Sequence, residues 1–268
     1  MKKKFKLGVI GAGFMASSII KGVINAEKIL PEQIIVSDVS EISLNKIHEY
    51  GVNVTLDNKV VCNNSEYVIF AVKPQNFSCV ADVVKDTDCE KYISIMAGVK
   101  KERIKELLGE VKVARCMPNT PCSIGYGAVA MDLNDFSLLE EKTFLKSIFS
   151  SIANVVEVNE NLINAVTGVS GSSPAYYYLF AKSIIDAGIK SGLDYETAKN
   201  LAVSTMIGAG QMILNNPDKS IDELISAVCS KGGTTIEAVK VYQENDIFKI
   251  SEKAIDACIK RAYELENL

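Results

Sequence analysis

The chain has 268 residues, and 48% of them are hydrophobic, which is enough for one large domain or two modest ones with a substantial core. Its formal net charge of −4 gives no indication of a nucleic-acid surface, and no uncharged run approaches the length of a membrane span. The seven cysteines include no C-x-x-C pair and the chain has one histidine, so we expect reduced thiols in a cytoplasmic protein and no metal site.

The stretch that begins at Leu7 predicts a nucleotide-binding unit. Leu7–Ile10 is a short uncharged run, as expected for a strand that is buried on both faces. Gly11–Gly13 breaks the run, and from Phe14 the apolar residues recur at helical spacing. Strand, glycine turn and helix are the context that a dinucleotide fingerprint requires, and its G-x-G-x-x-A pattern ends at Ala16.

The two glycines have separate expected roles. Gly11 permits a tight turn, and Gly13 lets the backbone approach a pyrophosphate, which would lie at the positive N-terminus of the helix. A glycine turn that binds no ligand would show the same pattern. The lysines at residues 2–4 before an uncharged run also suit a signal peptide. Glycines would interrupt its apolar core and cleavage would remove the first strand, so we favour the nucleotide-binding unit.

The first part of the chain alternates strand and helix. We expect strands at Leu7–Ile10, Ile34–Ser37, Val52–Thr55, Tyr67–Ala71, Tyr92–Ile95, Val111–Arg115, Ala128–Met131 and Val155–Val158. We expect helices between them at Phe14–Ala26, Ser43–Tyr50, Gln75–Val84, Lys101–Leu108 and Ser137–Ser150. This α/β alternation predicts a Rossmann-type doubly wound parallel sheet, with its ligands at the carboxyl ends of the strands.

After residue 159 the strand signals stop. We expect helices at Ile163–Val169, Pro174–Ser191, Tyr195–Asn215, Ile221–Val228, Thr235–Glu244 and Ile247–Leu265. The sequence thus predicts a dinucleotide-binding domain over residues 1–159 and an all-α domain over residues 160–268. The helix at Pro174–Ser191 is apolar nearly all round, and such a helix is usually buried on every side. In so small a domain we expect a second subunit to supply part of that burial.

The end of the second strand is where the adenosine ribose should bind. Asp38 could accept a hydrogen bond from the 2′-hydroxyl of NAD and would repel the phosphate of NADP. Ser37 and Asn58 could instead donate to that phosphate. Asp38 could also simply start a turn, so the residues leave the choice between NADPH and NADH open.

Two further strand ends lie at the same edge of the expected sheet. They are Ala71–Pro74 after the fourth strand and Ile95–Gly98 after the fifth. Small residues there leave room for a nicotinamide ribose, and Lys73 could reach it, although an exposed lysine is the simpler interpretation. Arg115–Pro121, after the sixth strand, suits either a wall of the site or an ordinary chain reversal.

The stretch Ser230–Thr235 is the most informative part of the second half. Its two glycines allow unusual backbone angles. Thr234 with Glu237 fits a capping box, which would be a purely structural role. The same helix start, with its hydroxyls and Lys231, also suits a carboxylate ligand. The residues by themselves support both interpretations.

The chain lacks the residues of several common mechanisms. Its single histidine, His48, falls among polar residues in an expected helix, and no serine–histidine pairing or acid–base pair is evident. Hydride transfer to an already protonated imine fits this absence. Such a reaction needs positioning, while the cofactor carries the chemistry.

Together these stretches resemble pyrroline-5-carboxylate reductase over essentially the whole chain. The matching stretches are Ile10–Ala16, Ala71–Pro74, Ala97–Val99, Arg115–Pro121, Val169–Tyr176, Asp186–Leu193 and Ser230–Thr235. Their order and spacing are far more specific than any one of them. The resemblance implies a Rossmann reductase with a helical dimerisation domain, often assembled into a ring of dimers. It implies reduction of L-1-pyrroline-5-carboxylate to L-proline, usually with NADPH.

The resemblance also implies the site residues. The cofactor would contact Ile10, Gly11, Ala12, Gly13, Phe14, Met15, Ser37, Asn58, Ala71, Val72, Lys73, Pro74, Met96, Ala97 and Gly98. The substrate would contact Glu160, Ser230, Gly232, Gly233, Thr234 and Thr235. In this scheme the backbone of Gly233 and Thr234 takes the substrate carboxylate, and the hydroxyl of Thr235 bonds the ring nitrogen. The site would lie between one Rossmann domain and the helices of the dimer, so monomers would be inactive.

Two residues depart from the usual pattern of the family. Lys231 stands where a proline is usual, and Ser173 stands where a glycine is common. Two other functions remain as alternatives. One is a related Rossmann reductase of another cyclic imine or of a hydroxy acid, for which Lys182 and Lys190 are available without motif support. The other is a non-catalytic regulatory protein that binds nucleotide.

Overall fold

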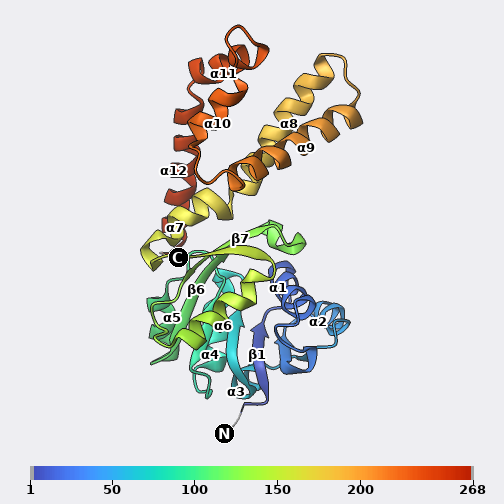
Figure 1. Ribbon diagram of the computed structural model, residues 1–268. Coiled ribbons are helices and arrows are strands. Elements are labelled where there is room, and N and C mark those ends of the chain that lie inside the picture. Colours follow the sequence, from blue (N-terminus) through green and yellow to red (C-terminus); the bar gives the residue numbers. More distant parts are fainter. Residues whose placement is uncertain (1–2, 267–268) are drawn as a thin grey trace. The chain divides into compact units, whose positions relative to one another are not determined.

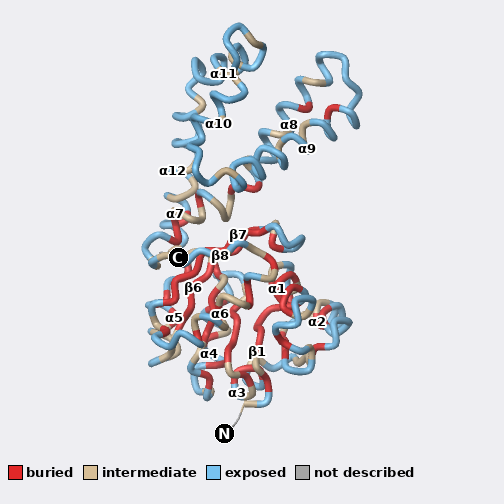
Figure 2. Tube along the Cα trace, in the orientation of Figure 1, coloured by how far each residue is buried: buried red, intermediate tan, exposed pale blue. Residues whose placement is uncertain are grey.

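The computed structural model describes residues 3–266 of the chain. It divides into two compact units, one formed by Met1–Pro174 with Cys258–Leu268 and the other by Ala175–Ala257. We call them the sheet unit and the helical unit. Figure 2 shows that the central strands of the sheet unit are buried, whereas most residues of the helical unit are exposed.

The sheet unit (Figure 1) contains one eight-stranded sheet. The order of its strands is β3-β2-β1-β4-β5-β6-β7-β8. Its strands are β1 Phe5–Ile10, β2 Ile34–Ser37, β3 Asn53–Thr55, β4 Ser65–Phe70, β5 Lys91–Ser94, β6 Lys112–Pro118, β7 Gly127–Asp132 and β8 Ala153–Glu157. The first six are parallel, which confirms the expected fold class. The expectation of a wholly parallel sheet is wrong at β7, which runs antiparallel to β6. The connection over residues 119–126 is too short for the crossover that parallel strands need.

Helices cover both faces of the sheet. They are α1 Phe14–Asn25, α2 Glu41–His48, α3 Asn58–Asn64, α4 Phe77–Val84, α5 Lys101–Leu108 and α6 Leu139–Ser150. Buried side chains of α1, α2 and α6 belong to one hydrophobic cluster, and those of α3, α4 and α5 belong to another. Successive residues of β1 point to opposite faces of the sheet, so Val9 belongs to the first cluster and Ile10 to the second.

Several helical segments differ from the expectation by one or two residues, and three departures have a local explanation. The sequence did not predict α3, which is polar at its ends and buries only Val61 and Cys62. The helix expected at Gln75–Val84 begins later, because Pro74 opens a short 3-10 turn, Pro74–Asn76. After α7 (Ile163–Val166) the chain continues as a π-helical turn, Thr167–Gly171, instead of the expected α-helix.

The last strand of the sheet ends before the point at which the two compact units divide. The last strand ends at Glu157, close to the point where strand signals stop in the sequence. However, α7 and the π-helical turn pack against β6 and β7, and the compact units divide only after Pro174. The functional division at residues 159 and 160 stays a prediction.

The second half of the chain is helical, as expected. Its helices are α8 Ser173–Lys190, α9 Tyr195–Leu214, α10 Ile221–Val228, α11 Thr234–Glu244 and α12 Ile247–Glu266. Asp194 caps α9, and Ser220 with Glu223 forms a capping box on α10. Within one chain α8 is not buried on every side, since Tyr178 is 62% and Leu179 70% exposed. Among residues 3–266, no helix combines the length and the apolar character that a bilayer crossing requires.

Gly8 on the central strand β1 gives a test of this packing. An added Cβ would lie 2.5 Å from Ser65 Oγ and 2.6 Å from Val61 Cγ1. We expect Gly8→Ala to lower the free energy of unfolding by about 1–3 kcal/mol, the usual cost of overpacking. Urea denaturation measures the change.

The same site provides a control. Ser65 Oγ is buried without a hydrogen-bond partner among the described residues, so Ser65→Ala alone should cost little. Because Ser65→Ala removes the nearest of the three clashing atoms, the double variant should recover part of the loss. Strictly additive effects would contradict the close approach of the two strands.

Candidate functional site

The carboxyl ends of three strands meet at one edge of the sheet. Ile10 at the end of β1 is paired with Ser37 of β2 and with Phe70 of β4. The N–H of Gly11 donates to the carbonyl of Ser37 at 2.7 Å, and the N–H of Ala71 donates to the carbonyl of Ile10 at 2.9 Å. The strand order reverses at β1, so this edge is the topological switch point at which doubly wound sheets bind ligands.

The glycine turn after β1 uses its two glycines differently. Gly11 has a φ of 103°, and a Cβ there would lie 2.6 Å from the carbonyl oxygen of Ala71. Gly13 is the N-cap of α1 in extended conformation, and a Cβ there would meet nothing within 4 Å. Ala16, the third small position, is buried at the helix–strand contact. Gly11 therefore makes the turn, while Gly13 leaves open space in front of the helix.

The start of α1 suits an anion. No acidic residue lies in its first turn, and no side chain caps it. Its first N–H groups and the positive end of its dipole are thus available to a ligand. With the open space at Gly13, the residues present fit the pyrophosphate of a dinucleotide.

Asp38 follows β2 and is bound to the same turn. Its Oδ2 accepts from the N–H of Ala12 at 2.7 Å, and its Oδ1 accepts from the N–H of Ser40 at 2.8 Å. Asp38 therefore does start a turn, which was one of the two roles that the sequence allowed. The bond to Ala12, which no local pattern indicates, ties the carboxylate to the glycine turn.

Ser37 and Asn58 lie together, as the resemblance implies. The hydroxyl of Ser37 donates to Oδ1 of Asn58 at 2.7 Å, and Ser37 is fully buried. Ser37 has thus already used its only donor hydrogen, and Asn58, which is partly exposed, is the member of the pair nearer to solvent. Their contact with an adenosine phosphate stays a prediction.

The expected nicotinamide side lies at the ends of β4 and β5. Lys73 is exposed and forms no ion pair among residues 3–266. Met96 is buried, and Gly98 has a φ of 73°. A Cβ on Gly98 would lie 2.9 Å from Cβ of Leu265, so packing against the end of α12 already requires a glycine here. The other residues expected on this side are Ala71, Val72, Pro74 and Ala97, all at least partly exposed.

The stretch Ser230–Thr235 belongs to the helical unit and forms a turn before α11. The N–H of Gly233 donates to the carbonyl of Ser230 at 2.9 Å, and Gly232 has a φ of 74°. The capping-box interpretation is wrong, because Gly233 is the N-cap and Thr234 lies one residue inside the helix. Glu237 instead bonds Lys240 at 2.8 Å.

The start of α11 has no side-chain cap, like that of α1. Thr234 and Thr235 are exposed, and within residues 3–266 no hydrogen bond is formed by either hydroxyl. The turn thus presents free hydroxyls beside free N–H groups, which is the arrangement that a carboxylate ligand requires.

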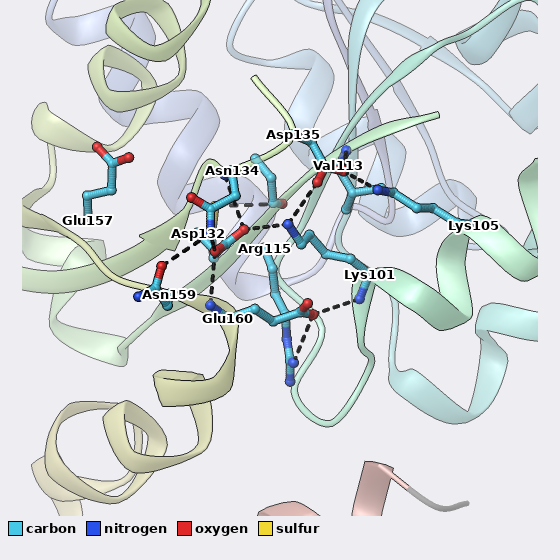
Figure 3. A network of polar contacts seen from close by, with 12 residues as sticks. Lys101, Lys105, Val113, Arg115, Asp132, Asn134, Asp135, Glu157, Asn159 and Glu160 are labelled. Atoms are coloured by element: carbon cyan, nitrogen blue, oxygen red, sulfur yellow. Dashed lines mark hydrogen bonds and ion pairs between the residues drawn. The ribbon is translucent and has the colours of Figure 1, made fainter. Parts of the chain in front are cut away.

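Glu160 has firm partners inside the sheet unit (Figure 3). Its Oε1 accepts from the N–H of Lys101 at 2.8 Å and from Arg115 at 3.2 Å, and its own N–H donates to Asp132 at 2.9 Å. Arg115, which is only 2% exposed, also bonds Glu266 at 3.0 Å. The sequence analysis did not predict this cluster. The one feature that could have indicated it is an arginine, Arg115, within an otherwise apolar stretch of a strand. A role for Glu160 in the substrate pocket stays a prediction.

A second ion cluster adjoins Glu160 (Figure 3). Lys101 contacts Asp132 at 2.5 Å and Asp135 at 2.9 Å, and Lys105 contacts Asp135 at 2.7 Å. Burial alone would raise the pKa of Asp135. Hydrogen bonds from Lys105, Lys101 and the N–H of Val113 outweigh that effect and hold the pKa below its usual value.

Two family models match the chain. The model described as pyrroline-5-carboxylate reductase dimerisation matches residues 160–265, and the one described as NADP oxidoreductase coenzyme F420-dependent matches residues 6–98. Pyrroline-5-carboxylate reductase from Synechocystis is 36% identical over 97% of this chain and 98% of its own.

Solved structures agree. Pyrroline-5-carboxylate reductase from Coxiella burnetii has a TM-score of 0.90 at 33% identity and covers 98% of this chain and 99% of its own. Pyrroline carboxylate reductase from Plasmodium falciparum, solved with NADP bound, has a TM-score of 0.87 at 28% identity. It covers 99% of this chain and 100% of its own.

The cluster at Asp135 predicts a pH-dependent contribution to stability. A carboxylate whose pKa is lowered by folding stabilises the fold above its unfolded pKa of about 4, and this contribution is lost as the pH falls through the lower folded value. We expect Asp135→Asn to lower the free energy of unfolding by about 1–3 kcal/mol at neutral pH, because hydrogen bonds to charged groups are lost. The difference from wild type should shrink below about pH 4.

Urea denaturation across the acid range measures this difference. Asp82→Asn is the matched control, since Asp82 is 70% exposed and pairs with Lys85 at 3.6 Å. It should change stability little at any pH. A loss in Asp135→Asn that stays constant with pH would contradict the assignment.

Gly13→Val tests the open space in front of α1. A Cβ at this position clashes with nothing, so the protein should remain folded, with a nearly unchanged melting temperature. The added side chain fills the space that a pyrophosphate needs, so dinucleotide binding should be abolished. Calorimetric titration with NADPH measures the affinity of the variant for the dinucleotide. Unchanged affinity would place the cofactor elsewhere.

Proposed function

Because the chain belongs to the pyrroline-5-carboxylate reductase family, we propose that it reduces L-1-pyrroline-5-carboxylate to L-proline, the last step of proline synthesis, with hydride from NADPH. The observation that carries this proposal is the similarity along the whole chain, which includes both the glycine turn and the turn before α11. Lys182, considered for hydroxy-acid chemistry, forms an exposed ion pair with Asp186.

The sheet unit would hold the cofactor. The N–H groups of Gly13, Phe14 and Met15 would line the open space in which we place the pyrophosphate. Those of Gly11 and Ala12 are already bonded to Ser37 and Asp38. The segments Ala71–Pro74 and Met96–Gly98 would border the nicotinamide. When bound, the cofactor supplies the hydride, and the residues of the chain supply orientation and the exclusion of water.

The turn before α11 would hold the substrate. The N–H groups of Gly233 and Thr234 stabilise the carboxylate at the positive end of the helix, and exposed Lys231 adds positive charge nearby. The hydroxyl of Thr235 bonds the ring nitrogen and so orients the imine carbon toward the hydride. The imine is already protonated, so no general acid is required. The single histidine is consistent with this, because Nδ1 of His48 lies 2.9 Å from the carbonyl of Val52.

We further propose a homo-oligomer built from dimers, either a homodimer or a ring of them, in the cytoplasm. The dimerisation family model over residues 160–265 supports this assembly. So do the apolar side chains that one chain leaves exposed on α8 and α9: Tyr177, Tyr178, Leu179, Leu201, Ile207 and Leu214. All seven cysteines are unpaired, as a reducing compartment requires.

The direct test is oxidation of NADPH by the purified protein in the presence of DL-pyrroline-5-carboxylate, with proline identified as the product. Rapid oxidation that yields proline is the expected result. A protein that binds NADPH but turns over neither this substrate nor other cyclic imines would overturn the proposal in favour of a regulatory role.

Thr235 gives the sharpest test of the site. Thr235→Ala removes one hydrogen bond to the reacting ring, so kcat/KM should fall by the equivalent of about 1–3 kcal/mol while the Kd for NADPH stays nearly unchanged. Thr235→Ser keeps the hydroxyl and should retain most of the activity. If both variants lost cofactor affinity instead, our placement of the substrate would be wrong.

A further inference from the structure

Asp38 is a carboxylate held in a fixed place beside the expected cofactor path. One oxygen is bonded to the N–H of Ala12 inside the glycine turn and the other to the N–H of Ser40, at 2.7 and 2.8 Å. Asp38 itself is partly exposed, and the next residue, Val39, is 95% exposed. The carboxylate is therefore both rigid and accessible.

The two hydrogen bonds do not occupy all of the acceptor sites of the Asp38 carboxylate. A carboxylate group offers about four acceptor sites, so about two remain on Asp38. Ribose hydroxyls are donors, and the end of the second strand is where this fold presents an acidic residue to the ribose 2′-hydroxyl. Asp38 thus has the position, the rigidity and the free acceptor sites to bind an unphosphorylated ribose.

The surroundings offer little to a phosphate at the same place. The three arginines of the chain are Arg103, Arg115 and Arg261, so none falls within the first 102 residues. Each of the three is paired with a glutamate. Among residues 3–266, no lysine or arginine forms an ion pair with Asp38.

The neighbouring polar side chains do not compensate for this lack of positive charge. Ser37 is buried and its hydroxyl hydrogen is directed at Asn58. Asp57, the residue before Asn58, adds a second carboxylate near this edge. A 2′-phosphate, with a charge of about −1.5 to −2, would meet the negative charges of Asp38 and Asp57, which exposed Lys59, the residue after Asn58, offsets only in part.

We propose that Asp38 is a specificity-determining residue that binds the adenosine ribose, so that the enzyme binds and uses NADH at least as well as NADPH. The inference rests on the proposed function, because it requires a dinucleotide in the sheet unit. It concerns the adenosine end alone and is independent of the chemistry at the imine.

The test compares the Kd values of NADH and NADPH for the full chain. The protein has no tryptophan, so the fluorescence of the reduced nicotinamide reports binding without interference from the indole group. Wild type should bind NADH at least as tightly as NADPH. In Asp38→Asn the amide oxygen still accepts from Ala12 but the charge is gone, so the Kd for NADH should rise about tenfold and that for NADPH should fall. Asp38→Ser should shift the ratio in the same direction.

A second readout isolates the adenosine end. Calorimetric titration with adenosine 5′-monophosphate and with adenosine 2′,5′-bisphosphate compares two probes that differ only by the 2′-phosphate. Wild type should favour the monophosphate, and Asp38→Asn should reverse or remove that preference. The kcat/KM ratio for NADH over NADPH should move in parallel with the ratio of the affinities.

Asp57→Asn is the matched control. It removes the same charge close to Asn58, and asparagine caps a helix as well as aspartate does, so α3 should remain intact. Its NADH to NADPH ratio should stay close to that of wild type. An equal shift in this variant would mean that the general field of the edge, and not Asp38, sets the preference.

The outcomes separate the two proposals. Wild type that binds NADPH more than about tenfold tighter than NADH overturns the role of Asp38, as does an unchanged ratio in both Asp38 variants. Those results leave the reductase itself intact. Failure of the protein to bind either dinucleotide would instead overturn the proposed function.

Discussion

The close approach of the turn after β1 to the end of β4 is the constraint on which the rest of the sheet unit depends. Gly11 comes so near the carbonyl of Ala71 that no side chain fits, and its N–H is bonded to the carbonyl of Ser37. These contacts bring three strand ends to one point and aim the start of α1 at the space in front of Gly13. Asp38 strengthens the arrangement because it binds the turn from the side of β2. The site is therefore a product of backbone geometry more than of particular side chains.

A second set of interactions holds the sheet unit together beyond its apolar core. Arg115 is buried, and burial of an unpaired charge is costly, so its two glutamate partners are a structural requirement. One partner, Glu160, is also bonded to the backbone of Lys101 and through its own N–H to Asp132. Asp132 in turn contacts Lys101. The ends of β6 and β7 are thus joined by charges that satisfy one another within a small volume.

Much of this fold could be predicted from local patterns. The strand at Ile34–Ser37 and the helices at Lys101–Leu108 and Ile221–Val228 have the expected bounds, because the apolar pattern of each is bounded by clear breaks on both sides. The glycine turn was recognisable because its conformation demands particular residues. In contrast, α3 carries too short an apolar stripe to be recognised, and the direction of β7 depends on the length of a loop and not on the composition of the strand.

The candidate site was predictable in its backbone elements and less so in its polar contacts. The turn at Ser230–Thr235 was identified, but the cap of α11 lies at Gly233, because a threonine pattern cannot show which residue leaves the helix first. The bonds of Asp38 to Ala12 and of Arg115 to Glu266 join residues that are 26 and 151 positions apart. Such pairings form only when the chain is folded, so local sequence patterns cannot predict them.

One contact shows how the two units are joined along the chain. Sγ of Cys258 lies 3.3 Å from Oγ of Ser172, so the chain leaves the sheet unit and re-enters it at adjacent points. In topological terms the helical unit is an insertion into the sheet unit, and the two ends of the insertion lie close together. Such close ends are typical of sites that tolerate domain insertion. A short bridge between these two positions would close the backbone of the sheet unit. The length and sequence of the inserted helices can therefore vary with little strain on the sheet that binds the nucleotide.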